Sequence, residues 1–184
     1  SRSQKSVALS AEAAAAVGLA KTVATPVEIM RAVLAAPVDL LWFGGIGTYL
    51  RASDETNQEV GDRATDAIRI TAAQVRAKVI GEGANLGVTQ RARIEFGLEG
   101  GRNNSDAIDN SGGVNCSDVE VNIKIALAAA MRKGTLQRPA RNRLLADMTG
   151  EVARLVLANN YQQTLALSLA RKRGLADIAH QARF

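Results

Sequence analysis

Two glycine-rich turns are the first features of this sequence that could do chemistry. The Gly-Ile-Gly of residues 45–47 follows the apolar run 38–43, and the Gly-Glu-Gly of residues 81–83 follows the apolar run 78–80. Both match the first half of the glycine fingerprint that binds a dinucleotide. Each lacks the third glycine, and neither is followed convincingly by an acidic residue about 20 positions later that could hold the ribose. A single turn of this kind is better explained as a tight bend after a buried strand.

Amide side chains accompany these turns. Asn85 closes the Glu-Gly-Ala-Asn sequence, and Asn110 opens the Asn-Ser-Gly-Gly-Val sequence of residues 110–114. An amide side chain offers both a donor and an acceptor to a ligand, while Gly112 and Gly113 let the main chain approach a ligand closely. Because these segments follow successive predicted strands, their order favours a shared ligand site over isolated turns.

A serine follows at a predicted helix start. Ser117 and Glu120 have the spacing of a capping box, which helix physics alone explains. The same position could also bind a carboxylate, because unbonded N–H groups and the positive end of the helix dipole meet there. Both interpretations stay open, and the two roles can coexist.

Other reactive residue types lack the neighbours that chemistry would need. Cys116 has no second cysteine and no context for a nucleophile, so we expect a small packing residue. His180 is the single histidine, and no set of His, Cys and carboxylate residues has metal-ligand spacing. The basic residues 171–173 end a predicted helix, where the dipole favours cations, and no aromatic platform accompanies them. The sequence therefore predicts no metal site and no nucleic-acid partner.

Alternating strands and helices must position these loops. Capping hydroxyls precede three predicted helices, at residues 11–17, 26–35 and 89–98. Short apolar or alternating runs predict strands at residues 38–43, 67–70, 78–80 and 107–108. Ligands of a parallel sheet bind at the carboxyl ends of its strands. The loops after residues 43, 80 and 108 are therefore the candidate sites.

The remainder of the sequence is predicted to be helical. Apolar residues recur at helical spacing from Ser117 onward, Pro139 can open a further helix, and Gly174 can end the last one. The predicted fold is α/β, a partial Rossmann-like parallel sheet with helices, followed by an all-helical segment.

Composition limits the class of protein. A chain of 184 residues with 47% hydrophobic and 22% charged residues can form one ordinary domain with an appendage. Its net charge of +5 is spread along the chain, as on a solvated surface. A single cysteine and the lack of a run of roughly 18 apolar residues predict a cytoplasmic protein without a membrane span. Since the sequence opens at Ser1 without a signal peptide, we expect a piece of a longer chain.

The strand-end segments, taken together, resemble those of glutamate dehydrogenases. In that superfamily one strand ends in an acid-Gly-Ala-Asn turn, and the next ends in Asn-Ala-Gly-Gly-Val with a serine three residues further on. This chain has the same pattern, with Ser111 in place of the alanine. The surrounding sequence is similar to the large bacterial NAD-specific branch over residues 38–50, 60–64, 78–95, 105–127, 144–149 and 160–167.

The resemblance implies NAD as cofactor and L-glutamate and 2-oxoglutarate as substrate and product. Asn85 and Asn110 would lie beside the nicotinamide ribose and carboxamide, and Ser117 would hydrogen-bond the side-chain carboxylate of glutamate. The residues that would contact the cofactor are Gly44, Gly45, Asn85, Asn110, Gly112 and Gly113.

The resemblance also sets the expected limits of this chain. Residues 1–132 would be the later part of the dinucleotide-binding catalytic domain, and residues 133–184 a helical C-terminal extension. The catalytic lysine and aspartate of the family would lie outside the chain, so we expect no catalytic residue and no activity from this piece alone. The partners would be the rest of the parent chain and further copies of it in a homo-oligomer. Two alternatives remain: another amino-acid dehydrogenase of the superfamily, or a structural or interaction module built on residues 144–167.

Overall fold

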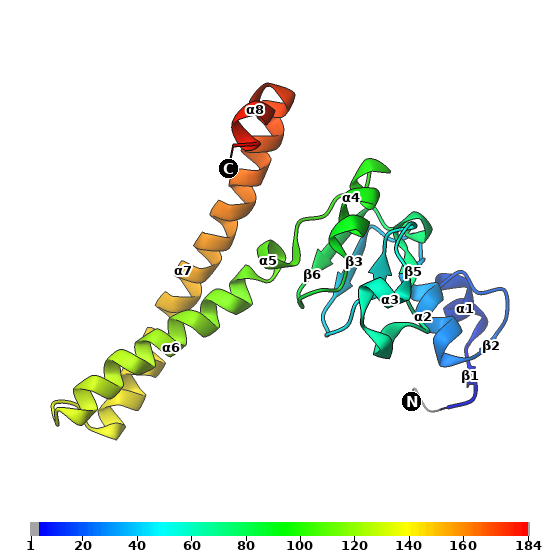
Figure 1. Cartoon of the computed structure of the whole chain (residues 1–184). Coiled ribbons are helices and arrows are strands. Elements are labelled where there is room, and N and C mark those ends of the chain that lie inside the picture. Colours follow the sequence, from blue (N-terminus) through cyan, green and yellow to red (C-terminus); the bar gives the residue numbers. More distant parts are fainter. Residues whose placement is uncertain (1–3, 184) are drawn as a thin grey trace. The chain divides into compact units, whose positions relative to one another are not determined.

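Parallel strand pairing organises the first part of the chain, as Figure 1 shows. In this computed structural model, which describes residues 4–183, β3 (Leu40–Phe43) pairs in parallel with β6 (Val79–Glu82). β4 (Leu50–Arg51) pairs in parallel with β5 (Ile70–Thr71). Parallel strands joined through helical crossovers are typical of an α/β fold. The predicted fold class is confirmed.

Capped helices connect these strands. Thr25 precedes α2 (Pro26–Leu34) in a capping box, in which Glu28 N donates to Thr25 Oγ1 at 3.2 Å and Thr25 N donates to the Glu28 carboxylate at 2.8 Å. Thr89 caps α4 (Gln90–Leu98). Both helices confirm the prediction made from their capping residues. The shorter elements of this part are β1 (Val7–Ala8), α1 (Ala11–Ala16), β2 (Val23–Ala24), α3 (Asn57–Val60), α5 (Asp106–Asp109) and two 3₁₀ turns, Arg63–Thr65 and Ala72–Gln74.

The apolar core lies on one face of the β3–β6 pair. Leu41 and Ile80 belong to it together with Phe96 of α4. The alternate residues of β3, Leu40 and Trp42, are 53% and 55% exposed. The apolar run suggests a strand buried on both faces, but only one face is covered, because α2 and α4 both contribute to this single core.

Polar contacts tie the loop of residues 52–55 to α4. Ser53 donates from its N–H and its hydroxyl to the Glu95 carboxylate, at 2.6 and 2.5 Å. The Thr89 hydroxyl donates to Glu55 Oε2 at 2.5 Å. The helix is therefore held by hydrogen bonds on one side and by apolar packing on the other.

The chain divides into two compact units, residues up to Asp109 and residues from Asn110. The second unit is helical, as predicted, with α6 (Ser111–Arg132) packed against α7 (Arg138–Arg173) and a short α8 (Ile178–Gln181). The sequence predicts two pieces for residues 139–173, whereas α7 is one continuous helix of 36 residues. No helix in the described part of the chain combines the length and the apolar character that crossing a membrane requires.

Candidate functional site

The carboxyl ends of β3 and β6 lie side by side. Phe43 is opposite Glu82 in the parallel register, so the two loops that follow leave from the same edge of the sheet. Ala84 N donates to Phe43 O at 3.1 Å. A main-chain hydrogen bond thus joins the end of β3, directly before the first loop (residues 44–48), to the second loop (residues 83–87). The structure brings two of the predicted strand-end loops together.

The first loop carries two glycines that local packing does not require. A Cβ atom added to Gly45 would meet no described atom within 4 Å, and one added to Gly44 would meet only Trp42, at 3.8 Å. Both glycines are exposed. An apolar cavity of about 260 Å³ is lined by these glycines and by side chains of α2 and β3 that include Met30 and Leu41. The main chain of the first loop is therefore open to close approach by a ligand.

The glycines around the second loop have a different cause. A Cβ atom at Gly81 would lie 2.5 Å from the Trp42 indole, and one at Gly83 would lie equally close, at 2.5 Å. Real carbon atoms in contact lie roughly 3.5–4.0 Å apart, so neither position tolerates a side chain while the indole stays in place. The Gly-x-Gly pair of residues 81–83 is explained by the indole that packs on it.

A fully buried carboxylate ends β6. Glu82 is 0% exposed, and its oxygens accept from Arg93 Nε at 2.8 Å and Arg93 Nη2 at 3.0 Å. The Arg93 side chain is 9% exposed. Glu82 Oε1 also accepts from Val88 N at 3.0 Å. The bidentate pair keeps the buried charge compensated and at the same time fixes the end of the second loop.

Two aspartates complete this support. Asp106 Oδ2 accepts from Leu86 N at 2.8 Å, and Asp106 Oδ1 lies 3.2 Å from Arg93 Nη2. Asp109 Oδ2 accepts from Glu82 N at 3.0 Å. We call Glu82, Arg93, Asp106 and Asp109 the Arg93 cluster. The sequence analysis does not predict this cluster, because the spacing of the four residues does not indicate contacts that form only in the folded unit.

Leu86 sits at the strained point of the second loop. Its φ of 61° is the one positive value at a non-glycine residue among residues 4–183. A left-handed backbone costs a leucine roughly 1–2 kcal/mol and persists where surrounding contacts impose it. The Asp106 carboxylate on the Leu86 N–H is such a contact. The preceding residue, Asn85, is exposed on this turn.

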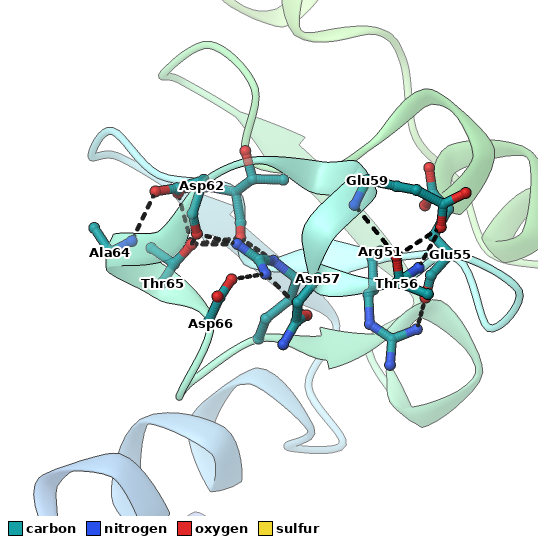
Figure 2. Close-up of polar contacts among 11 residues, drawn as sticks. Arg51, Glu55, Thr56, Asn57, Glu59, Asp62, Ala64, Thr65 and Asp66 are labelled. Carbon is teal, nitrogen blue, oxygen red and sulfur yellow. Dashed lines mark hydrogen bonds and ion pairs between the residues drawn. The ribbon is translucent and has the colours of Figure 1, made fainter.

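A second buried arginine supports the first loop. The Arg69 side chain is 0% exposed and donates from Nε to Thr48 O at 2.8 Å. It also donates from Nη1 to Asn57 Oδ1 at 2.9 Å and from Nη2 to Asp62 O at 2.6 Å. Asn57, Asp62 and Thr65, which are labelled in Figure 2, all accept hydrogen bonds from this guanidinium. Each loop is therefore anchored by a buried arginine.

Asp62 holds the first loop directly. Its Oδ2 atom accepts from the Thr65 hydroxyl at 2.6 Å and from Thr48 N at 2.9 Å. These hydrogen bonds hold the pKa of the Asp62 carboxyl below its usual value, and the one from Thr65 has the largest effect. The charged form of Asp62 is the form that fixes Thr48.

The third predicted loop does not follow a strand. Residues 107–108, predicted as a strand, lie in α5, where Ile108 N and Asp109 N both donate to Ser105 O at 3.1 Å. The prediction is wrong because these local hydrogen bonds already satisfy the backbone, and no described strand pairs with this segment.

The predicted helix start at Ser117 is also wrong. Helical bonding begins earlier, where Val114 N donates to Asn110 O at 3.1 Å, so Ser117 lies inside α6 and is exposed. Glu120 pairs with Lys124 instead of reaching back to form a capping box. Ser117 can offer its hydroxyl to a ligand, but the N–H groups of a helix interior are bonded to the preceding turn.

Asn110, Gly112 and Gly113 lie at the start of α6 in the second unit. A Cβ atom at Gly113 would lie 2.7 Å from Asn110 Oδ1, so the Asn110 amide covers this glycine. Ser111 is buried, and its hydroxyl accepts from Asn160 Nδ2 of α7 at 2.7 Å. The sequence gives no sign of this partner for Ser111, because the contact depends on how the two helices pack.

The remaining candidate residues form no site. Cys116, expected as a packing residue, is exposed on α6. His180 lies in α8, and the basic residues 171–173 form the last turn of α7 before Gly174. Within residues 4–183 no group of three or more potential metal ligands converges.

The chain is similar to bacterial glutamate dehydrogenases along almost its whole length. Residues 1–170 match the family model described as bacterial NAD-glutamate dehydrogenase, catalytic domain. The NAD-specific glutamate dehydrogenase of Pseudomonas aeruginosa is 53% identical over 182 residues, which cover 99% of this chain. Those of Mycobacterium tuberculosis and Halomonas elongata are 52% identical over 177 residues and 49% identical over 183 residues, covering 93% and 100% of this chain.

The matched region is a small part of each relative. The chain spans 11% of the length of these three curated proteins. The family match and the identities of about one half agree with each other and with the resemblance carried by the strand-end motifs. This chain belongs to the family of bacterial NAD-glutamate dehydrogenases, within their catalytic domain.

Proposed function

We propose that the protein carrying this chain catalyses the NAD-dependent oxidative deamination of L-glutamate to 2-oxoglutarate and ammonia. The family match over residues 1–170 and the printed names of the three relatives support this activity. The structural observation that carries the proposal is the shared edge of β3 and β6, where Gly44, Gly45 and Asn85 lie on the two loops that follow these paired strands. Glutamate is favoured over the substrates of related amino-acid dehydrogenases by the names of those relatives.

The residues at this edge fit a dinucleotide. The exposed main chain of Gly44 and Gly45 leaves room for close approach, and the Asn85 amide offers both a donor and an acceptor. Bound NAD would supply the hydride acceptor of the reaction. The family resemblance makes Asn110, Gly112 and Gly113 of the second unit further candidate residues for binding NAD.

Ser117 would bind the side-chain carboxylate of glutamate through its hydroxyl alone, because the N–H groups around it are engaged inside α6. The lysine and aspartate that activate the substrate in this family would come from other parts of the protein. The 184-residue chain by itself should therefore be inactive. We place the enzyme in the cytoplasm, since the single cysteine of this chain fits a reducing compartment.

Ser117→Ala in the full-length enzyme tests the substrate assignment. A hydrogen bond to a charged group contributes roughly 1.5–3 kcal/mol, so the KM for glutamate should rise about tenfold or more while the KM for NAD changes little. Ser168→Ala, which removes another exposed helical hydroxyl, is the matched control. An unchanged KM for glutamate would favour a different amino-acid substrate.

Two further measurements test the rest of the proposal. Asn85→Ala should raise the KM for NAD, whereas the control Asn142→Ala on α7 should not. The isolated 184-residue chain should give no glutamate-dependent NADH formation. Robust turnover by the isolated chain would contradict the assignment of catalytic residues to other parts of the protein.

An interaction role for the helices is the second candidate. After Asn160, which contacts Ser111, α7 exposes three apolar side chains. Tyr161, Leu165 and Leu169 are 67%, 42% and 49% exposed. Apolar side chains at this spacing suit packing against the rest of the parent chain or another copy of it in a homo-oligomer. Sedimentation of the chain with and without residues 139–184 tests this, since lost self-association on truncation is the expected result.

A further inference from the structure

Three peptide planes around the second loop are held by carboxylates. The N–H of Glu82 is bonded to Asp109, the N–H of Leu86 to Asp106, and the N–H of Val88 to Glu82. These bonds lie before, within and after the loop. Because a peptide unit is planar, fixing its N–H also fixes the carbonyl and the Cα atom of the preceding residue.

The middle plane bears on the candidate cofactor residue. The N–H of Leu86 belongs to the same peptide unit as the carbonyl of Asn85, so the Asp106 bond fixes the backbone from which the Asn85 side chain projects. The left-handed φ of Leu86 agrees with a conformation imposed by this contact. Asp106 is itself oriented by Arg93, whose guanidinium is already fixed by the buried Glu82.

We propose that Asp106 is a positioning residue for NAD, which acts through the second loop by fixing the Asn85–Leu86 peptide and does not touch the cofactor. The inference rests on the proposed function, and within it assigns a role to a residue outside the strand-end motifs. Arg93 and Glu82 carry the constraint from the interior of the sheet to Asp106.

Asp106→Asn in the full-length enzyme is the sharpest perturbation. Two donors, Arg93 Nη2 and Ala107 N, face Asp106 Oδ1, whereas among residues 4–183 one donor, Leu86 N, faces Oδ2. The single amide oxygen of asparagine therefore turns toward the pair of donors, and the Leu86 N–H loses its acceptor. If the loop then keeps its competent conformation about one-tenth of the time, the Kd for NAD rises roughly tenfold.

The control variant is Asp54→Asn. Asp54 also pairs with an arginine of α4, Arg91, but the two side chains are 66% and 52% exposed. The substitution is chemically identical, and the pair lies outside the loop. Calorimetric titration of this variant should give the Kd for NAD of the unmodified enzyme.

Binding of AMP separates positioning from general damage. AMP lacks the nicotinamide riboside, so Asp106→Asn should leave its Kd within about twofold while the Kd for NAD rises roughly tenfold. In an Asn85→Ala background the added effect of Asp106→Asn should fall below about twofold, because both changes remove the same contact. The proposal would be overturned if Asp106→Asn raised the Kd values for AMP and NAD equally, or if its effect on the Kd for NAD added fully to that of Asn85→Ala.

Leu86→Gly provides a second, independent route. Leu86 is 65% exposed, so its replacement leaves the core intact, and glycine adopts the left-handed φ of 61° without the strain that leucine carries. Combined with Asp106→Asn, Leu86→Gly should recover part of the lost NAD affinity while the Kd for AMP stays constant, because glycine adopts the loop conformation without needing the Asp106 contact to impose it. An unchanged Kd for NAD in Asp106→Asn alone, or no recovery in the double variant, would overturn the inference. If Asn85→Ala raises the Kd for NAD and Asp106→Asn does not, only the positioning role of Asp106 fails. If the unmodified enzyme does not bind NAD, the proposed function fails with it.

Discussion

Replacing Gly83 by alanine should destabilise the chain by displacing the Trp42 indole. The added Cβ atom would lie 2.5 Å from Trp42 Cζ2 and 2.8 Å from Cε2. Carbon atoms in contact need roughly 3.5 Å, so the ring has to move by about 1 Å. Overpacking of this kind typically costs about 1–3 kcal/mol. Since Trp42 is 55% exposed and can pivot outward, we expect the lower part of this range, about 1–2 kcal/mol.

Trp42 is the only tryptophan of the chain, so its fluorescence reports the event directly. Urea denaturation of the 184-residue chain should show a lower midpoint for Gly83→Ala, with tryptophan emission shifted to longer wavelength in the folded state. In a Trp42→Ala background, followed by circular dichroism, the cost of Gly83→Ala should fall below about 0.5 kcal/mol. An equal cost in both backgrounds would refute the reasoning, because the penalty would then come from the backbone.

Three further perturbations follow from the contacts of the first loop and of α2. Arg69→Met should lower the unfolding free energy by about 3–5 kcal/mol in urea titration, since it removes a buried guanidinium from several acceptors; a loss below about 1 kcal/mol would contradict this. Hydrogen bonds, of which the one from Lys21 has the largest effect, lower the pKa of Glu28 from 4.5 to about 2. The contribution of Glu28 to stability is therefore complete above pH 4.5 and is lost as the pH falls toward 2. The Tm of the unmodified chain should therefore fall more steeply with decreasing pH across this window than the Tm of Glu28→Gln. Gly45→Ala should leave stability unchanged or raise it by up to about 1 kcal/mol, whereas Gly47→Ala should destabilise, because its φ is 136° and its Cβ would lie 2.9 Å from a threonine methyl; the reverse order of midpoints would contradict both expectations.

Local signals in the sequence predict much of the first unit. The capping residues Thr25 and Thr89 locate two helices, and the apolar runs before Gly44 and Gly81 locate the central strands. These features are readable because each depends on a few neighbouring residues. Parallel pairing follows from the alternation of strands and helices, and it places the two loops at one edge.

The prediction fails where local signals compete. Ser117 and Glu120 have the spacing of a capping box, but helical bonding is already established at Asn110, and the box cannot form inside a helix. The Asp106–Asp109 segment is too short for its apolar residues to distinguish a strand from a helical turn. The positions of helix starts are decided here by hydrogen bonds that the pattern does not encode.

The Arg93 cluster could not be read from the sequence for a different reason. Glu82 belongs to a recognisable motif, whereas Arg93 and Asp106 lie in other elements, and nothing local marks them as its partners. Charged residues are usually solvated, so the burial of Glu82 and Arg93, with Asp106 only 16% exposed beside them, is unexpected without the fold. A site of this kind is found only by asking what compensates a carboxylate with no exposure to water.

The polar attachment of residues 52–55 to α4 bears on how the first unit opens. The N–H groups of Ala52 and Ser53 donate to the Glu55 and Glu95 carboxylates, both at 2.6 Å, although Ser53 is exposed to solvent. Amide protons of a surface loop normally exchange quickly with deuterated water, but the Ser53 proton is released only when its bond to α4 breaks. This loop should therefore exchange in step with the helix as one cooperative segment, even though Ser53 and Glu95 lie 42 residues apart in the chain.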